Sequence, residues 1–512
     1  GPRTVNDPVA ATATTPVAAD LAAARKPLSL FHRKSIALLL AQAQDEGEGT
    51  LRRGLGAFHL TMLGVGAIVG AGIFVITGQA AAQHAGPAIA LAFVIAGFVC
   101  ALSALCYAEL ASMIPVAGSA YTYAYATLGQ LIAWIIAWDL MAEYLFAAAA
   151  VSVGWSGYFT GLLANLGIHL PAALTQAPFA QGAGHALVAT GALINLPAVM
   201  IVALVAAVLV VGISESARIN AAIVMLKVGV VVLVIVFGLL HADPANWTPF
   251  IPPLEIDPVT GASRYGLSGV AAAAAVIFFA YLGFDSVSTA AQEARDPQRT
   301  LPISILASLA LCTVLYILTC FAVTGMAPFA MLDVPAPIYA AVDHVGAQLA
   351  WLKPLVTIAA TVGLASTLLS LLYGQSRIFY AMARDGLLPP AFGRVHPKRR
   401  TPVAGTAITA VIAAAFGGLF PIGVLGELVS IGTLLAFALI CGGVIYLRLK
   451  RPDLPRGFRT PVWWLTAPLG IVSCLYLIAQ LPVATFVRLL VWMAIGLVVY
   501  FAYARRHAEL VR

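Results

Sequence analysis

Charged side chains are scarce in this sequence, and their scarcity excludes a soluble globular protein. Only 10% of the 512 residues are Asp, Glu, Lys or Arg, whereas a soluble domain has about 25%. Hydrophobic residues make up 61% of the chain, and the mean hydropathy is +0.95. These values are typical of an integral membrane protein.

Cysteine and histidine are also few, and their spacing excludes the usual disulfide and metal patterns. The six cysteines stand within apolar runs, without a C-x-x-C pair or a Cys/His cluster. We interpret them as packing residues and expect no metal site. Catalytic signatures are missing too, because no nucleophile elbow and no paired catalytic carboxylates occur. The sequence therefore indicates that the chain is not an enzyme and needs no cofactor.

Twelve apolar runs follow one another along the chain. A helix needs about 20 apolar residues to span a bilayer, and in hydrocarbon every backbone polar group must be satisfied within its own segment. The pattern therefore predicts an all-α integral membrane protein with 12 transmembrane helices. The predicted segments are residues 57–82, 86–111, 127–160, 197–216, 218–240, 267–290, 301–325, 350–382, 402–420, 424–447, 461–481 and 484–504.

Composition sets the N-terminal residues apart from the rest of the chain. Residues 1–50 are predicted to form a mostly disordered cytoplasmic tail, because the first half of this stretch is rich in Ala, Thr and Pro and poor in bulky apolar side chains. Residues 51–447 contain the first ten predicted segments, and residues 448–512 contain the last two and a short cytoplasmic C-terminus. The Gly-Pro start without a Met is compatible with protease cleavage.

The basic residues are divided unevenly between the two sides of the predicted membrane domain. If the N-terminus is cytoplasmic, both tails and the loops on that side hold 24 of the 28 Lys and Arg residues. The opposite side holds only Arg264, Lys353 and Arg488. This bias follows the positive-inside rule, so we predict cytoplasmic termini in a multi-pass protein of the cytoplasmic (inner) membrane. The basic clusters lie in short loops at the ends of helices, and this position argues against a nucleic-acid partner.

The first segment carries the stretch GAIVGAGIF, in which Gly66, Gly70 and Gly72 occupy three of seven consecutive positions. Each Gly costs about 1 kcal/mol relative to Ala in a helix interior, so the stretch predicts a break in the helix. Close helix packing is the alternative, because small residues spaced by three are common where membrane helices touch.

The sixth segment has its own irregular centre, FFAYLGFD at residues 278–285. It lies five segments after the first, and paired Gly-interrupted segments in two halves of a chain are typical of inverted-repeat transporters. If segments 1–5 match segments 6–10, the odd repeat length gives the two halves opposite orientations. The two breaks can then face each other near the membrane centre.

Two broken helices offer the two kinds of group that bind an α-amino acid. Half-helix N-termini present N–H groups that suit a carboxylate, a role that we assign to the amides of residues 70–72. Unwound carbonyls suit an ammonium group, and Gly66 is a supporting position at the same break. The candidate substrate-binding residues are Ile68, Gly70, Ala71, Gly72, Phe279, Ala280, Leu282 and Gly283.

These motifs resemble those of the amino acid–polyamine–organocation (APC) superfamily. GAIVGAGIF resembles its first-helix signature, and FFAYLGFDSVSTAAQEARDPQRTLPISI (278–305) and YGQSRIFYAMARDGLLPPAF (373–392) resemble helix signatures of the cationic amino acid transporter-like branch. The resemblance covers about residues 50–505. It implies a leucine-transporter-type 5+5 inverted repeat with broken helices 1 and 6, two extra helices, and secondary amino acid transport. Bacterial members of this branch are typically proton-coupled.

Lys227 lies about ten residues, or about 15 Å, into the fifth segment. Its side chain is too short to reach water easily, and an ionisable residue at that depth is a functional hypothesis by default. The resemblance implies a coupling role, since a matching lysine in proton-coupled relatives places its ammonium where sodium-coupled members hold sodium. The alternative is a structural cation paired with Asp139 or Glu143, which share one face of the third segment.

Further residues near the breaks are candidates for support or gating. Ser366 and Thr367 of the eighth segment are predicted to help line the position of the buried ammonium. Tyr281 and Phe284 are candidates for an aromatic gate over the substrate, with core packing as an equal alternative. Asp285 is predicted to cap the half-helix that follows the second break.

Charged residues at the cytoplasmic ends of the segments are candidates for gate contacts. Glu109 ends the second segment, and we expect it to make a gate or loop contact. Arg384 and Asp385 follow the eighth segment, where a gate ion pair is one interpretation. Surface ion pairs of little energetic consequence are the alternative for these two residues.

Together these observations predict a secondary active transporter that imports amino acids by alternating access, in symport with protons through Lys227. An amino acid exchanger without obligatory proton coupling is the alternative, and a membrane amino acid sensor is a remote one. Cationic and small neutral substrates both stay open, because Asp139 or Glu143 can pair with a cationic side chain or with Lys227. The expected partners are the amino acid and the lipid bilayer, and no required protein partner is evident.

Overall fold

The fold comes from a computed structural model of the chain. It describes residues 29–37, 39–40, 55–116, 119–182, 186–211, 217–256, 258, 263–291, 294–394, 396 and 402–508. Most of the predicted N-terminal tail lies outside the described residues.

Helices dominate the described chain. In order they are α3 (Ala57–Ile68), α4 (Thr77–Ala80), α5 (Ile89–Met113), α6 (Ser119–Thr127), α7 (Gln130–Asn165), α8 (Leu196–Val211), α9 (Ala217–Leu240), α10 (Gly266–Ile277), α11 (Ser286–Thr289), α12 (Pro297–Met326), α13 (Pro337–Val345), α14 (Leu352–Arg384), α15 (Pro390–Gly393), α16 (Val403–Leu419), α17 (Ile422–Lys450), α18 (Trp463–Ala479), α19 (Val483–Val499) and α20 (Arg505–His507). Short 3-10 or π turns link several of them. They are η1 (Gly72–Ile76), η2 (Ala81–Ala85), η3 (Gly86–Ala88), η4 (Ala172–Leu174), η6 (Pro244–Trp247), η7 (Phe278–Tyr281), η9 (Phe329–Leu332), η10 (Ala347–Leu349) and η11 (Tyr500–Ala504).

Eight helical stretches within the described residues are long and apolar enough to cross a membrane. The stretch Ala57–Met113 is 57 residues long and contains two of the predicted segments. Three shorter apolar helices, α8, α16 and α18, have 16 or 17 residues each. The chain is therefore a helical multi-pass membrane protein, as its hydropathy predicts.

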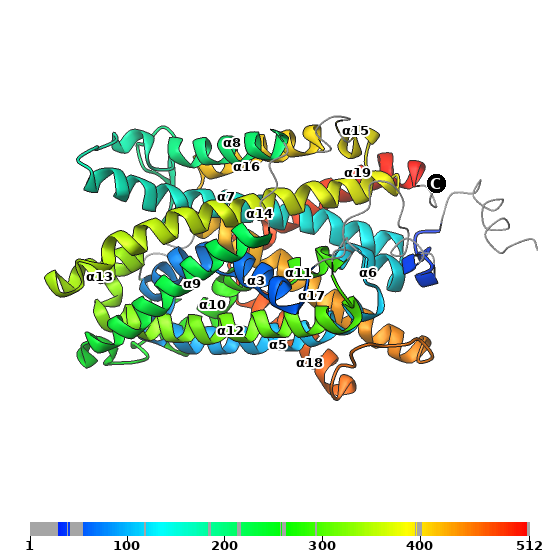
Figure 1. Ribbon diagram of the computed structural model, residues 1–512, viewed down its shortest axis with the longest axis horizontal. Coiled ribbons are helices and arrows are strands. Elements are labelled where there is room, and N and C mark those ends of the chain that lie inside the picture. The colour runs from blue at the N-terminus through cyan, green and yellow to red at the C-terminus, as the bar shows by residue number, and fades with distance from the viewer. Residues whose placement is uncertain are drawn as a thin grey trace, which may run out of the picture.

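The long helices form a bundle whose centre holds the two irregular segments. α5, α7, α12 and α14 run along the longest axis of the molecule (Figure 1). α3 packs against α9 and α12, and η7 packs against η1 and α17, so both breaks are enclosed by other helices. The apolar faces of these helices are buried against one another, which places the candidate site inside the bundle.

The expectation of an all-α protein needs one correction. Two short antiparallel hairpins lie in loops, β1 (Phe179–Gln181) with β2 (Leu187–Ala189), and β3 (Glu255–Ile256) with β4 (Ser263–Arg264). In the first, Phe179 pairs with Ala189. Both hairpins lie in loops between the apolar runs. The apolar pattern predicts the helices and carries no information about the structure of these loops.

Candidate functional site

The first break interrupts the helix directly after Ile68. Val69, the residue that follows, has the non-helical backbone angles φ −74° and ψ 82°. The Gly70 amide donates to the Ile68 carbonyl only two residues back, at 2.8 Å. The helix resumes as the π turn η1, and π turns inside helices are frequent at functional sites. The glycine-rich stretch thus marks a true interruption of the helix.

The second break has a tighter form. α10 ends at Ile277 and continues as the 3-10 turn η7. Leu282 then leaves the helical conformation, with φ −55° and ψ 130°. Gly283 adopts φ +124°, a backbone conformation that residues with a side chain rarely take. α11 begins at Ser286. The segment therefore unwinds at the position that the sequence predicts.

The two breaks touch each other. A methyl group on Gly283 would lie 2.7 Å from the Cβ of Ala67 and 2.9 Å from the backbone nitrogen of Ile68. Gly72 on the first break packs in the same way against Ala280 on the second. Segments about 200 residues apart in the sequence are thereby joined backbone to backbone.

Tyr316 of α12 links the two breaks through their carbonyl groups. Its hydroxyl lies 2.7 Å from the Ile68 carbonyl oxygen and 2.6 Å from that of Ala280, in position to donate to either. The Ser430 hydroxyl of α17 also accepts from the Phe279 amide at 3.0 Å. Sequence reasoning missed both side chains. The only available signal was a polar residue at the centre of an apolar segment.

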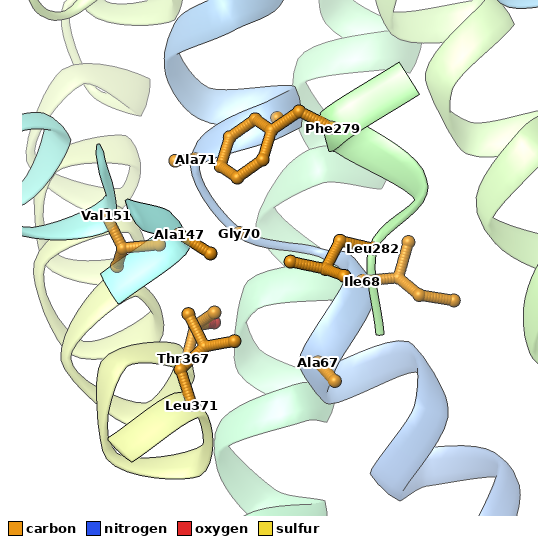
Figure 2. A pocket seen from close by; sticks show the side chains of 11 residues that line it. Ala67, Ile68, Gly70, Ala71, Ala147, Val151, Phe279, Leu282, Thr367 and Leu371 are labelled. Atoms are coloured by element: carbon orange, nitrogen blue, oxygen red, sulfur yellow. The ribbon is translucent and has the colours of Figure 1, made fainter. Parts of the chain in front are cut away.

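A small cavity lies where the breaks meet α7 and α14 (Figure 2). Its volume is about 10 Å³, roughly the space for a single water. The side chains around it are apolar, except for the hydroxyl of Thr367. The lining residues are Ala67, Ile68, Gly70, Ala71, Gly72, Ala147, Val151, Phe279, Leu282, Thr367 and Leu371. The cavity is too small for an amino acid, so a larger ligand enters only if its walls move apart.

Lys227 of α9 reaches the first break from outside the cavity. It is fully buried, and its ammonium donates to the Gly66 carbonyl at 2.6 Å and to the Thr367 hydroxyl at 3.2 Å. Thr367 in turn donates to the carbonyl of Gly363 at 3.0 Å. One ammonium group therefore connects α9, α3 and α14 at the edge of the predicted substrate site.

Of the two hydroxyl residues predicted beside the ammonium, the structure brings Thr367 to it. Ser366 is buried, and its carbonyl accepts a hydrogen bond from the Ser370 hydroxyl at 3.1 Å. The two residues are adjacent on a helix, so their side chains point in different directions. This explains why only one of them meets Lys227.

Asp139 and Glu143 lie toward α17. A methyl group on Gly432 would lie 2.7 Å from Oδ1 of Asp139, and the Glu143 carboxyl contacts the Thr433 hydroxyl. Neither oxygen of Asp139 has a hydrogen-bond partner among the described residues. The described contacts of both carboxyls are thus with α17, the helix that Ser430 joins to the second break.

The aromatic residues of the second break point in different directions. The ring of Phe279 lines the cavity, as Figure 2 shows. Tyr281 donates its hydroxyl to the Phe93 carbonyl of α5 at 2.9 Å. Phe284 packs against Tyr107 and Phe437, with ring centroids 6.0 and 5.0 Å away. These contacts favour core packing, the alternative to a gate role, for Tyr281 and Phe284, whereas Phe279 lines the cavity.

The predicted cap role of Asp285 is met only in part, because its carboxyl interacts with the backbone N–H groups of Gly283 and Ser286 but does not reach the next turn of α11. No side-chain hydrogen bond from it caps α11. Its Oδ2 instead accepts from the Ser119 hydroxyl of α6 at 3.4 Å, and its Oδ1 has no partner among the described residues.

Ion pairs gather at the end of the bundle that carries α6 and α15. Lys34 donates to Asp385 at 3.0 Å, and the Tyr121 hydroxyl donates to the second oxygen of the same carboxylate at 2.5 Å. Glu109 binds Arg448 at 2.8 Å and Arg456 at 3.0 Å. The gate or loop contact expected of Glu109 thus joins α5 to Arg448 in the last turn of α17 and to Arg456 in the loop that follows it.

Residues 55–501 match the family model described as amino acid permease. The chain belongs to this family. The match covers most of the chain and confirms the resemblance to the APC superfamily. An amino acid permease is a membrane transporter, so the family indicates a transporter and not an enzyme.

Individual relatives agree with this assignment. The chain is 47% identical over 483 residues to the branched-chain amino acid permease BcaP of Bacillus subtilis, covering 94% of this chain and 99% of the relative. It is 43% identical over 482 residues to the methylthioribose transporter of the same organism, with the same coverage. It is also 37% identical to the vacuolar cationic amino acid transporter 4 of Arabidopsis thaliana, covering 80% of this chain and 66% of the relative. These names support transport of amino acids or related small molecules by this permease.

Proposed function

We propose that this permease imports a neutral, apolar α-amino acid together with a proton. The observation that carries the proposal is the 2.6 Å hydrogen bond from Lys227 to the Gly66 carbonyl. It places a titratable group of α9 on the helix that leads into the substrate site. Binding or loss of one proton there changes the contacts of that helix directly.

The proposal includes the architecture that the sequence predicts. Segments 1–5 and 6–10 form a 5+5 inverted repeat over residues 51–447, and residues 448–512 add the last two of 12 transmembrane helices. The mutual contact of the two breaks supports this arrangement, because facing breaks at the repeat interface are typical of such transporters. The termini are cytoplasmic and the protein lies in the cytoplasmic membrane, on the evidence of the basic-residue bias.

The substrate binds by its α-carboxylate and α-amino groups between the breaks. The amides of residues 70–72 receive the carboxylate, and the carbonyls of Ile68, Phe279, Ala280 and Leu282 receive the ammonium. The Tyr316 hydroxyl now lies on two of these carbonyls and stands in for an ammonium donor there. Substrate entry therefore requires the cavity walls to separate and the Tyr316 contacts to be shared or exchanged.

The side chain of the substrate is proposed to be apolar. No carboxylate lines the cavity among the described residues, whereas Ala147, Val151, Phe279 and Leu371 do. A cationic side chain would lack a counter-ion in this apolar pocket, at a high desolvation cost. BcaP of Bacillus subtilis is named as a branched-chain amino acid permease, which supports Val, Leu and Ile as the first substrates to test.

Proton coupling follows from what the two forms of Lys227 can bind. The protonated ammonium holds the Gly66 carbonyl and the Thr367 hydroxyl together, which ties α3 to α9 and α14. A neutral amine is a weaker donor, because hydrogen bonds to charged groups are about twice as strong. Loss of the proton therefore loosens α3, and alternating access couples this change to release of the substrate.

The test is uptake into proteoliposomes from a panel of amino acids that includes Val, Leu, Ile, Ala and Arg, together with methylthioribose. We expect accumulation of the branched-chain substrates only with an inward proton gradient. Lys227→Met should abolish accumulation while some substrate binding remains. Lys353→Met, which removes a partly exposed lysine, is the control and should accumulate substrate normally.

Three results would overturn the proposal or parts of it. Gradient-driven accumulation by Lys227→Met at the wild-type level would remove the coupling role of this lysine. Rapid counterflow without any response to a proton gradient would favour the exchanger. Equal, low uptake of every compound in the panel would contradict amino acid transport itself.

A further inference from the structure

A second and larger cavity lies away from the two breaks, between α7, α16, α17 and α19. Its volume is about 340 Å³, compared with about 10 Å³ for the cavity at the breaks. Apart from two charged residues, its lining side chains are apolar, with Phe146, Phe416 and Leu425 among them. Nothing in the proposed transport mechanism uses this space.

α19 is attached to its neighbours on both sides of the cavity. At one point Trp138 and Trp492 each donate an indole N–H to the other's carbonyl, at 2.8 and 3.1 Å, and their rings stack 4.8 Å apart. At the other, Thr485 donates to Glu427 of α17 at 3.0 Å. Between these contacts the side chains of α7 and α17 do not fill the gap.

The cavity opens toward the surface that faces the bilayer in a membrane-spanning bundle. Val487, Val491 and Ile495 of α19 line it and are themselves 55%, 56% and 49% exposed. Buried Leu425 and Phe146 form its inner wall. Hydrocarbon from the membrane can therefore enter sideways without crossing a polar surface.

Hydrocarbon alone would not be retained there. Lipid chains are as apolar as the residues of the cavity wall, so moving a chain from the bilayer into the cavity has little driving force. Selective occupancy requires a polar group of the ligand to find a partner in the cavity. Two charged side chains offer such partners.

The first partner is Arg488. Its Nη1 forms a long ion pair with Oε2 of Glu427 at 3.8 Å, and this nitrogen has no hydrogen-bond partner among the described residues. Its guanidinium lines the cavity close to the end of α19. A guanidinium in this position suits a phosphate, which it binds through parallel N–H donors.

The second partner is Asp139, which lines the same cavity and is only 1% exposed. Both of its oxygens lack a hydrogen-bond partner within the described part of the chain. Asp139 lies at the level of Gly432 on α17. Gly432 follows Glu427 by five residues, so Asp139 lies about 7–8 Å farther along that helix than Glu427 does. A carboxyl group that carries its proton at this depth can donate a hydrogen bond to a carbonyl oxygen.

We propose that this cavity binds one membrane glycerophospholipid. Its phosphate binds Arg488, an ester carbonyl accepts a hydrogen bond from Asp139, and one acyl chain fills the apolar space beside Val491. The order of the polar groups matches the ligand, because in a glycerophospholipid the ester groups lie one glycerol unit deeper in the membrane than the phosphate. The site is independent of the substrate site at the breaks.

The test compares three lipids with the same chain lengths in native mass spectrometry of the purified full-length protein. They are diacyl phosphatidylglycerol, its diether analogue without ester carbonyls, and a glucosyl diacylglycerol without phosphate. We expect the wild type to retain diacyl phosphatidylglycerol about tenfold better than either of the others, since each lacks one polar contact.

The variants assign each contact to its residue. Arg488→Gln should retain the phospholipid and the glucolipid equally, and Asp139→Leu should no longer distinguish the diacyl from the diether lipid. Asp139→Asn keeps a donor of the same shape and should behave as the wild type, which controls for folding. Val491→Trp, which fills the cavity from its exposed side, should lower retention of all three lipids, and Lys353→Gln is the control for loss of a cation elsewhere.

The opposite outcomes would overturn the proposal. These are equal retention of all three lipids by the wild type, or wild-type discrimination in both Arg488→Gln and Asp139→Leu. Loss of substrate uptake with unchanged lipid retention would concern the transport site and leave this proposal in place. The two proposals can therefore fail separately.

Discussion

Gly72 of the first break and Ala280 of the second are in direct contact. A methyl group on Gly72 would lie 2.4 Å from both the Cα and the Cβ of Ala280. Atoms cannot approach so closely, and a backbone atom cannot turn away as a flexible side chain can. The contact between the two halves of the site therefore depends on a missing side chain.

Substitution of Gly72 by alanine should separate the breaks and abolish transport. The added methyl group must push Ala280 away, and a displacement of about 1 Å at a binding site is enough to cost about a hundredfold in activity. Uptake into proteoliposomes measures the loss. Gly442→Ala is the matched control, because nothing lies within 4 Å of a methyl group at that helical position. Comparable uptake by the two variants would contradict a functional contact between the breaks.

Tyr316→Phe should destabilise the closed site. The change removes the hydroxyl that lies 2.7 and 2.6 Å from the carbonyls of Ile68 and Ala280, and an unsatisfied buried acceptor costs about 1–3 kcal/mol. We expect a lower thermal midpoint in detergent and slower uptake. Tyr339→Phe removes an exposed hydroxyl that donates to Asn165 and should leave both values close to wild type. Equal midpoints for the two variants would show that the Tyr316 contacts carry little energy.

Asp385→Asn should destabilise the contacts between Lys34 and Asp385 at the end of the bundle that carries α6. The substitution leaves the largely buried ammonium of Lys34 without its anion, which costs about 3 kcal/mol when one partner of a buried pair is removed. The double variant Lys34→Met/Asp385→Asn should recover part of the lost stability, because no charge is then left buried without a partner. Asp453→Asn is the control, because its pair with Arg451 is exposed and such pairs contribute about 0–1 kcal/mol.

Leu371→Ala should shift substrate preference toward larger apolar amino acids. Leu371 lines the cavity at the breaks, and its truncation adds room for a longer side chain. A difference of one or two methylenes changes discrimination about 10- to 200-fold in an apolar pocket. Competition by Phe and Met against labelled Leu measures the change. An unchanged order of competitors would place the side-chain pocket elsewhere.

Much of the site could be predicted because its cause is local. Glycines in an apolar run weaken a helix whatever that helix packs against. Gly66, Gly70 and Gly72 therefore indicate a break even when the neighbouring helices are not known. The same holds for the depth of Lys227, which follows from its position in an apolar run and the rise per residue of a helix. Both features are properties of one segment.

The features that sequence reasoning missed depend on how segments meet. Tyr316 stands in an apolar run like many membrane tyrosines, and only the packing of α12 shows that its hydroxyl reaches two breaks. Likewise, the adjacent residues Ser366 and Thr367 have similar side chains, and the rotation of α14 decides which meets Lys227. The rotation of a helix about its axis is set by tertiary contacts, which one sequence does not reveal.

The loop contact of Glu109 bears on how this protein can be cut or fused. Its carboxylate accepts from Arg448, Arg456 and the Thr460 amide, all of which follow residue 447. The partners of this buried carboxylate thus lie at the end of α17 and in the segment that leads to α18. A chain shortened to its first ten segments would leave this carboxylate buried without its cations. Residues 448–460 are therefore a structural part of the permease and not a removable linker.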